Sequence, residues 1–210
     1  GVATLSKLPL ISSQLGFSSD DNTAQKRFIH SQYLLPNQQI LHVMNGYFPQ
    51  GESRDHETKF PYKEKFYADL NKHIANIPAS NLAIMGGDFN IAHTDIDIGI
   101  GTQNAKRWLQ TGKCAFLPEE RAWMEHLLSW GWIDTYRYQH PQVTQEERQY
   151  SWFDYRSRGF EDIPKRGLRI DFLLASQGLM PHLIETGINY PIRGMDKPSD
   201  HAPIWASFNI

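Results

Sequence analysis

The sequence predicts one α/β domain in which mixed β-sheets are stacked in layers with helices, and three observations support this. Candidate strands outnumber candidate helices along the chain. Several neighbouring strands are joined by short local turns, which favours mixed pairing over a purely parallel sheet. The 210 residues contain no repeat, low-complexity segment or linker, so residues 1–210 are predicted to form a single domain.

The N-terminal region is predicted to contain paired strands. Residues 27–35 and 39–45 are rich in residues that favour strands, and they flank a turn at Pro36 and Asn37. Residues 1–6 resemble the middle of a strand, and the sequence does not begin with an initiator Met. We therefore expect that the chain is truncated at its N-terminus.

The centre of the chain is predicted to contain a helix and a buried strand. Apolar residues recur at helical spacing after Pro61, and Pro78 ends the pattern. The apolar run at residues 82–85 leads into Gly86 and Gly87, which is typical of a buried strand followed by a sharp turn. Residues 95–117 are then expected to form a long connection.

The C-terminal half is predicted to contain one helix and three strands. The helix is expected to begin at Pro118. Residues 167–175 are predicted to form a buried strand that Asp171 interrupts. Two further strands are expected near Leu183–Ile188 and Ile204–Phe208.

Composition narrows the classes of function. The net charge of -2 gives no global basic field, which argues against avid, non-specific coating of DNA. A single cysteine, Cys114, excludes an internal disulfide and fits a reducing compartment, and we interpret it as a buried thiol. No signal peptide or membrane-length apolar run is visible, so a cytoplasmic protein is expected.

Asp88 and Asn90 follow the buried strand and are the first candidates for chemistry. A carboxylate and an amide two residues apart leave the strand end on the same side. Their oxygens suit Mg²⁺, which keeps several waters and needs only one or two carboxylates. An ordinary turn is the alternative, because both residue types favour turns.

Asp200, His201 and Asp171 are the second group of candidates. Asp200 and His201 adjoin each other just before an apolar segment, so they can anchor a metal ion and orient a phosphate. Asp171 lies in an apolar run and would be costly to bury unpaired. We expect a histidine as its partner, with a salt bridge to Arg169 as the alternative.

An aromatic and arginine-rich segment suggests contact with nucleic acid. Its members are Trp152, Phe153, Tyr155, Arg156 and Arg158, which suit stacking on bases or sugars and contact with phosphate. A core tryptophan with solvated arginines is an equally good interpretation of this pattern alone.

Other polar and aromatic residues give weaker signals. Arg107, Trp108 and Lys113 form a sparser version of the aromatic and basic pattern, and Tyr47 in its Gly- and Pro-bounded loop reads as a surface aromatic or an oxyanion donor. The histidines at positions 42, 73 and 126 form no visible cluster in the sequence.

Six segments of the chain resemble a known family. They are residues 45–54, 87–90, 107–109, 151–156, 168–171 and 199–203. Together they resemble the exonuclease III family of bacterial enzymes, which belongs with the abasic-site endonucleases to the endonuclease/exonuclease/phosphatase superfamily. The likeness runs from Gly1 almost to the end of the chain.

The resemblance implies a four-layered α/β sandwich, two packed mixed sheets flanked by helices. It implies a monomeric, Mg²⁺-dependent nuclease, with Mn²⁺ as a possible substitute, that acts on double-stranded DNA in the nucleoid. The implied activities are 3′-to-5′ exonuclease action on duplex ends, cleavage beside abasic sites, cleaning of blocked 3′ ends and RNase H-type hydrolysis.

The resemblance also assigns roles to particular residues. Tyr47, Asp88, Asn90, Asp171 and His201 match catalytic positions. In these matches Asp88 activates water, Asn90 steadies the pentavalent phosphate and Asp171 pairs with His201. Asp88, Asn90 and Asp200 match metal ligands, and Gln50, Trp152, Arg156 and Leu168 are expected to contact DNA.

One departure from the family pattern leaves two other functions open. The family has an Asn motif and a metal-ligand glutamate in strands that do not precede Gly1 here. A catalytically impaired module that binds duplex DNA is therefore one alternative. A phosphatase of the same superfamily is another, although the segment around Trp152 argues against it.

Overall fold

The computed structural model describes residues 1–144 and 146–210. In these residues a six-stranded sheet has the order β1-β2-β3-β4-β6-β5, and β7 pairs with β8 in a second sheet. The strands are β1 (Leu10–Leu15), β2 (Phe28–Leu34), β3 (Ile40–Tyr47), β4 (Leu82–Asp88), β5 (Trp132–Asp134), β6 (Asp171–Ser176), β7 (Leu183–Ile188) and β8 (Ile204–Phe208). Because β3 and β4 are parallel and the other neighbours antiparallel, the large sheet is mixed.

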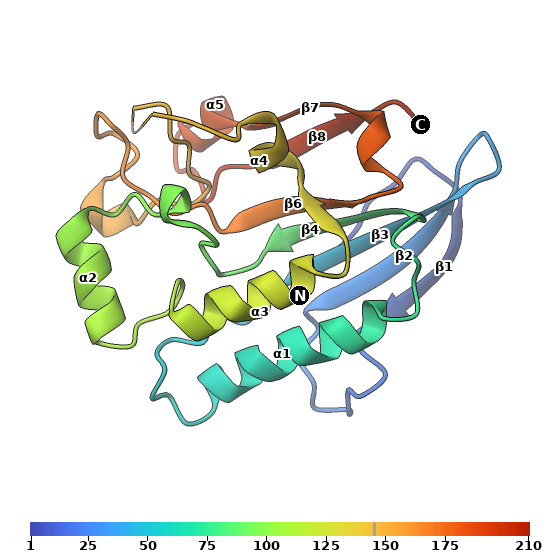
Figure 1. The fold of residues 1–210 in the computed structure, drawn as a ribbon, viewed down its shortest axis with the longest axis horizontal. Coiled ribbons are helices and arrows are strands. Elements are labelled where there is room, and N and C mark those ends of the chain that lie inside the picture. The colour runs from blue at the N-terminus through green and yellow to red at the C-terminus, as the bar shows by residue number, and fades with distance from the viewer. Residues whose placement is uncertain (145) are drawn as a thin grey trace.

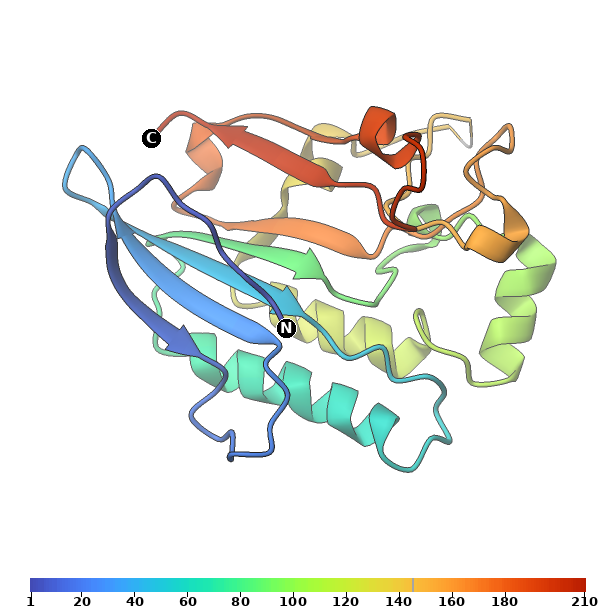
Figure 2. The same ribbon diagram turned by 180° about the vertical axis from the view of Figure 1, so that it is seen from behind.

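The elements form stacked layers (Figure 1). The helices α1 (Lys59–Ile74) and α3 (Pro118–Leu128) lie along one face of the six-stranded sheet, and β7 and β8 lie on the opposite side. The view from behind shows the same order (Figure 2). Two short helices, α4 (Thr135–Gln139) and α5 (Tyr190–Arg193), accompany the second sheet. The predicted mixed α/β fold is therefore confirmed.

The main hydrophobic core lies between the large sheet and the helices α1 and α3. Leu70 and Leu127 from the helices are fully buried, and Met85 and Leu174 meet them from the sheet. Each such side chain contributes roughly 1.5–3 kcal/mol when it is buried. The core continues to the ends of the strands, where the ring of Phe89 stacks on a neighbouring phenylalanine at 4.1 Å.

The hairpin, the helices that begin near Pro61 and at Pro118, and the two C-terminal strands are confirmed. The prediction of a strand at residues 1–6 is wrong, since the first strand is β1. The contact of this segment with β3 is made by a side chain, because Nδ2 of Asn45 donates to the carbonyl of Ala3 at 2.8 Å. Leu5 remains 97% exposed, so nothing pins the segment into a ladder.

Two other predicted segments also differ from the structure. The connection at residues 95–117 contains a 3₁₀ turn at Asp95–Asp97 and a helix, α2 (Thr102–Gln110). The helix α2 is short and mostly polar, and none of its nine residues is fully buried. The strand predicted at 167–175 begins only at Asp171, because Leu168 instead forms bridges with Ile98 and Trp152.

No helix in the described part of the chain is long and apolar enough to cross a membrane.

Candidate active site

Three neighbouring strands bring three predicted site residues to one edge of the large sheet. Tyr47 and Asp88 are partners at the carboxyl ends of the parallel strands β3 and β4. Asp171, the first residue of the antiparallel strand β6, is the partner of Asp88 on its other side. The register of this sheet therefore gathers residues that are far apart in the sequence.

The turn after β4 holds Asp88 and Asn90 against each other. The backbone N–H of Asn90 donates to Oδ1 of Asp88, and its side-chain Nδ2 donates to Oδ2, both at 2.9 Å. Nδ2 also donates to the carbonyl of Phe48 at 3.0 Å. Asn90 has a φ of 54°, which costs a non-glycine residue about 1–2 kcal/mol. The predicted turn is thus present, and its hydrogen bonds fix the carboxylate.

The side-chain amide of Asn90 has two partners in this structure. Both amide hydrogens of Asn90 are already engaged, one by Phe48 and one by Asp88. The amide therefore holds the carboxylate of Asp88, and its oxygen remains available to a cation.

Asp88 is poised to exchange a proton near neutral pH. Burial raises the pKa of its carboxyl to about 7, and the negative charge of Asp171 adds to the effect, while His201 opposes it. A group whose pKa lies near the working pH is well suited to act as a general base or acid.

Asp171 and His201 form the predicted carboxylate–histidine pair. Nδ1 of His201 lies 2.9 Å from Oδ2 of Asp171. Burial alone would lower the pKa of His201, but the hydrogen bond and charge of Asp171 outweigh it and raise the pKa to about 9. The imidazole is therefore a cation at neutral pH. Arg169, the alternative partner, instead binds Asp97 at 2.7 Å and Asp134 at 2.6 Å.

Ser151 anchors the segment that carries Asp171, and sequence reasoning missed it. Its buried hydroxyl accepts hydrogen bonds from the backbone N–H groups of Ile170 and Asp171, both at 3.0 Å. Its carbonyl accepts from the N–H of Ala202 at 2.7 Å. Ser151 thus links the two segments that meet in the Asp171–His201 pair, and its only sequence signal is its place next to Trp152.

These elements surround a cavity of about 250 Å³. The lining includes eight of the residues predicted from the sequence: Tyr47, Gln50, Asp88, Asn90, Trp152, Leu168, Asp200 and His201. The indole N–H of Trp152 donates to Oδ2 of Asp200 at 3.0 Å, so a wall of the cavity is bonded to a predicted metal ligand. Asp171 lies behind His201, and Arg156 is exposed outside the cavity.

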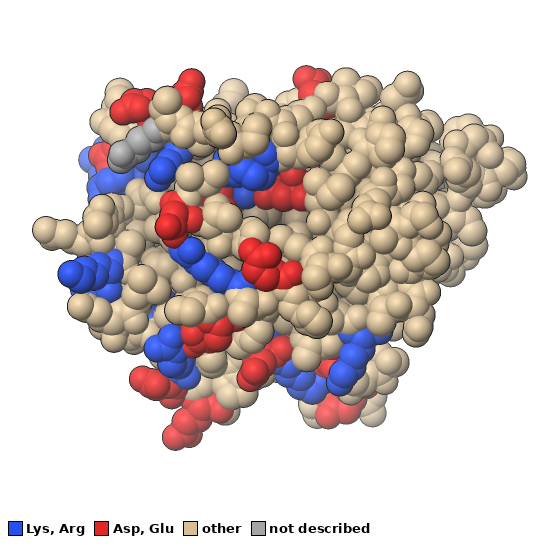
Figure 3. Space-filling model, viewed as in Figure 1, with Lys and Arg blue, Asp and Glu red and all other residues tan. Residues whose placement is uncertain are grey.

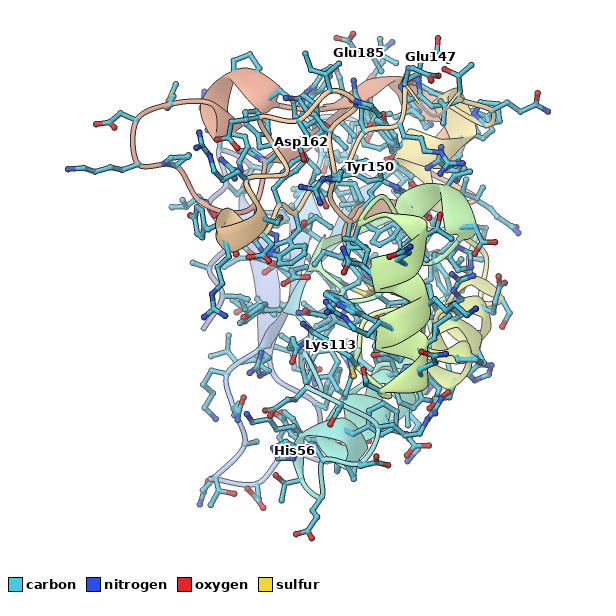
Figure 4. All side chains as sticks on the ribbon, turned by 90° about the vertical axis from the view of Figure 1, so that its left-hand side faces the viewer. His56, Lys113, Glu147, Tyr150, Asp162 and Glu185 are labelled. Carbon is cyan, nitrogen blue, oxygen red and sulfur yellow. The ribbon has the colours of Figure 1, made fainter. Side chains whose placement is uncertain are left out.

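Basic and aromatic side chains continue the cavity outward. Lys113 also lines it, and its ammonium lies 3.9 Å from the ring centroid of Trp108. Figure 4 looks onto this end of the molecule and shows Lys113 beside α2, with Tyr150 above it. Charged side chains gather towards the same end in Figure 3, whereas the right-hand part of that face is almost free of them. The entrance therefore combines a basic group with flat rings, as contact with DNA requires.

The cavity offers oxygen ligands for a hard cation. Asp88, Asn90 and Asp200 line it together, and a Mg²⁺ ion bound by two carboxylates would keep several waters. Among the described residues, no group of three or more His, Cys, Asp or Glu side chains is arranged to hold a metal ion, so protein carboxylates alone do not complete a site here. The donor set thus fits an open, oxygen-rich site.

Two other features lie outside this cavity. A larger cavity of about 780 Å³ adjoins α2 and contains none of the predicted site residues. The structure also brings together histidines that the sequence left unassigned: Nδ1 of His30 lies 2.9 Å from Nε2 of His73, and Nε2 of His30 lies 3.0 Å from Nδ1 of His42.

Comparisons with known proteins agree with this geometry. The model of the endonuclease/exonuclease/phosphatase family matches residues 1–201. The chain is 53% identical to exodeoxyribonuclease III of Haemophilus influenzae over 99% of this chain and 76% of that protein. It is 27% identical to an exodeoxyribonuclease of Bacillus subtilis, of which it covers 75%.

Solved structures give the same result. A 3′ phosphatase from Neisseria, bound to a product DNA hairpin, matches with a TM-score of 0.83 and 30% identity over 98% of this chain and 73% of that one. An AP endonuclease from Archaeoglobus fulgidus matches with a TM-score of 0.81 and 26% identity over 97% and 72%. The chain therefore belongs to the endonuclease/exonuclease/phosphatase family, as a hydrolytic nuclease of its DNA-repair branch.

Proposed function

We propose that this nuclease hydrolyses phosphodiesters of double-stranded DNA with Mg²⁺, or with Mn²⁺ in its place. Its proposed substrates are 3′ ends, blocked 3′ ends and abasic sites, and it is proposed to work as a monomer. The similarity to an exodeoxyribonuclease III supports the first activity, and the similarity to a 3′ phosphatase bound to a DNA hairpin supports the second.

One observation carries the proposal: a half-buried carboxylate and the histidine that pairs with Asp171 share a cavity with an aromatic wall. Asp88 has a pKa of about 7, His201 a pKa of about 9, and Trp152 lines the same space. A carboxylate that accepts a proton and a cation that stabilises negative charge are the two groups that hydrolysis of a phosphodiester needs.

Different residues of the cavity are proposed to have different roles in the hydrolysis. Asp88 orients water and takes its proton, and Asn90 holds that carboxylate in place through its amide. His201 and Tyr47 donate hydrogen bonds to the charge that grows on the phosphate, while Asp171 fixes the ring of His201. Oxygens of Asp88, Asn90 and Asp200 would hold a divalent ion, which would supply further stabilisation of negative charge.

Recognition of DNA is proposed to rely on shape more than on base sequence. Trp152 and Leu168 line the cavity and are proposed as apolar walls for an extruded abasic sugar. Gln50, Lys113 and the exposed Arg156 are proposed to contact phosphates. A lesion lowers the cost of extruding a nucleotide, so abasic duplex is expected to be preferred over intact duplex.

The test is Asp88→Asn in the complete protein, assayed on an abasic duplex with Mg²⁺ and with EDTA. The substitution removes the proton acceptor with little change in volume, so turnover should fall on the order of 10²–10³-fold. Asp95→Asn is the matched control, because Asp95 is an exposed carboxylate whose side chain is 89% accessible. A variant at position 88 with near-normal turnover would refute the assigned role.

Two measurements separate the alternatives. Faster hydrolysis of a soluble phosphomonoester than of an abasic duplex would favour a phosphatase of the same family. Retained affinity for abasic duplex without metal-dependent cleavage would favour a module that only binds DNA.

A further inference from the structure

A lysine and a glutamate are fully buried together directly beneath the candidate active site. Nζ of Lys63 in α1 lies 2.6 Å from Oε1 of Glu120 in α3, and both side chains are 0% exposed. Such a pair is a poor source of stability, because replacing it by uncharged groups of similar volume is often neutral or favourable. Its contacts suggest another role.

The ammonium group of Lys63 joins two loops that carry site residues. Besides Glu120, it donates to the carbonyl of Asn90 at 2.8 Å and to the carbonyl of Gln50 at 3.3 Å. These three acceptors use all three of its hydrogens. One buried group thus fixes the turn that holds the general base and the loop that is placed to contact phosphate.

A second residue of α1 supports the same turn. The hydroxyl of Tyr67 lies one helical turn beyond Lys63 and donates to the carbonyl of Phe89 at 2.8 Å. Two successive carbonyls, those of Phe89 and Asn90, are therefore fixed by one face of α1. These two hydrogen bonds stabilise the turn at Asn90, whose backbone has a left-handed conformation.

The position of the ammonium group is itself fixed from both sides. Oε2 of Glu120 accepts from the N–H of Leu117 at 2.8 Å, which caps the N-terminus of α3. On the other side, Gly51 lies against the stem of Lys63: a Cβ there would come within 3.0 Å of Cδ of Lys63 and 2.9 Å of Sγ of Cys114. The loop of Gln50 therefore packs against the side chain of Lys63 and also accepts a hydrogen bond from it.

We propose that Lys63 and Tyr67 are positioning residues for the reaction, with Glu120 as the ion-pair partner that holds the side chain of Lys63 in place. They act through the backbone carbonyls of Gln50, Phe89 and Asn90 and set the spacing between the loop of Gln50 and the turn of Asp88. The inference rests on the proposed function, because it concerns the placement of the proposed base. Misplacement of a reacting group by about 1 Å can cost on the order of 10²-fold in rate.

The test compares stability with kinetics in the complete protein. Lys63→Met alone leaves Glu120 buried without its counter-ion and should lower the melting temperature by roughly 10 °C. The double variant Lys63→Met/Glu120→Gln removes both charges and keeps a capping side chain, so its melting temperature should return close to that of the wild type. On abasic duplex with Mg²⁺, we expect its kcat to remain at least tenfold lower and its KM to rise, because both loops lose their donor.

Tyr67→Phe provides an independent kinetic signature. It removes the donor to the turn of Asp88 but leaves the loop of Gln50 held by Lys63, so kcat should fall severalfold while KM stays unchanged. It also tests the proposal if the double variant does not fold. Lys65→Met is the matched control, because Lys65 pairs with Asp69 on the same helix and its side chain is 56% exposed. Its kcat and KM should equal those of the wild type.

Three results are decisive. A double variant with restored stability and wild-type kcat and KM would overturn the positioning role. A Tyr67→Phe protein with wild-type kcat would do the same for the second residue. A wild-type protein that does not cleave DNA would instead refute the proposed function, so the two failures are distinguishable.

Discussion

Two groups of histidines in this molecule have opposite charge states. His201 lies beside the carboxylate of Asp171, and its pKa is raised to about 9 although burial alone would lower it. His30 lies between the imidazoles of His42 and His73, and burial together with their charges lowers its pKa to about 4. His30 is buried, whereas the side chain of His201 is 30% exposed, and both rings have partners at about the same distance.

The difference shows that a carboxylate partner can outweigh the effect of burial on the pKa of a histidine, whereas imidazole partners add to that effect. A carboxylate favours the imidazolium, whereas a second imidazole offers only a neutral hydrogen bond and repels a proton. The site therefore holds a permanent cation at neutral pH, and the group on β2, β3 and α1 holds three neutral rings. Four experiments test this comparison.

Removing the carboxylate should have the largest effect. Asp171→Asn leaves His201 with a neutral partner, so its pKa should fall from about 9 to its ordinary value or below. We expect kcat on abasic duplex to fall on the order of 10³-fold, because the ring loses both its charge and its orientation. NMR titration of the imidazole measures the pKa directly. An unchanged pKa would show that Asp171 is not the cause.

Acid should destabilise the protein through the second group. The pKa of His30 is lower when folded than when unfolded, so the unfolded chain binds more protons and stability falls as the pH drops from about 6.5 towards about 4. The shift corresponds to a loss on the order of 3 kcal/mol.

Urea unfolding at several pH values measures this slope. His30→Gln should flatten it, while His126→Gln, at an exposed position of α3, should not. For His201 the sign is opposite: its contribution is present below pH 6.5 and is lost as the pH rises through about 9.

Giving His30 a carboxylate should make it resemble His201. An aspartate at position 42 can place an oxygen near the position of Nδ1 of His42, which lies 3.0 Å from Nε2 of His30. His42→Asp should therefore raise the pKa of His30 by about 1–3 units, as an adjacent opposite charge does. His42→Asn is the neutral control, and NMR titration again provides the measurement. Equal pKa values in the two variants would contradict the explanation by charge.

The smallest effect is expected from a substitution of Ser151, which holds the segment that carries Asp171 of the Asp171–His201 pair. Ser151→Ala removes the acceptor of two buried backbone N–H groups, those of Ile170 and Asp171. Leaving buried donors unsatisfied should cost about 1–3 kcal/mol of stability, which chemical denaturation measures. Ser176→Ala, which alters a buried hydroxyl at the end of β6, offers a comparison without contact with the Asp171–His201 pair. A change in the pKa of His201 in the first variant alone would show that Ser151 also sets the geometry of the pair.

The sequence predicted the elements whose patterns are strong. The hairpin of β2 and β3 has a turn at Pro36, and α1 and α3 bury regular apolar faces, so their positions followed from local rules. The helix α2 was missed because it is short and mostly polar. The start of β6 was misplaced because Leu168 pairs with Trp152 outside the main sheet, which no local pattern reveals.

Site residues in contiguous motifs were predictable, and those that depend on tertiary contacts were not. Asp88 and Asn90 could be recognised from their place after a strand, and the apolar surroundings of Asp171 required a partner. The three histidines on β2, β3 and α1 gave no signal, because each is isolated in the sequence. Lys63 and Glu120 are likewise 57 residues apart, and only the packing of α1 against α3 brings them together.

The pairing of β4 with β6 has a practical consequence for any preparation of this protein. Asp88 stands opposite Asp171 in that ladder, and a shift of one residue would turn Asp171 to the other face of the sheet. A molecule with such a slip would be inert, not partly active. The fraction of turnover-competent molecules, counted by titration with a tight inhibitor, therefore sets a lower bound on the fraction that has the correct strand alignment.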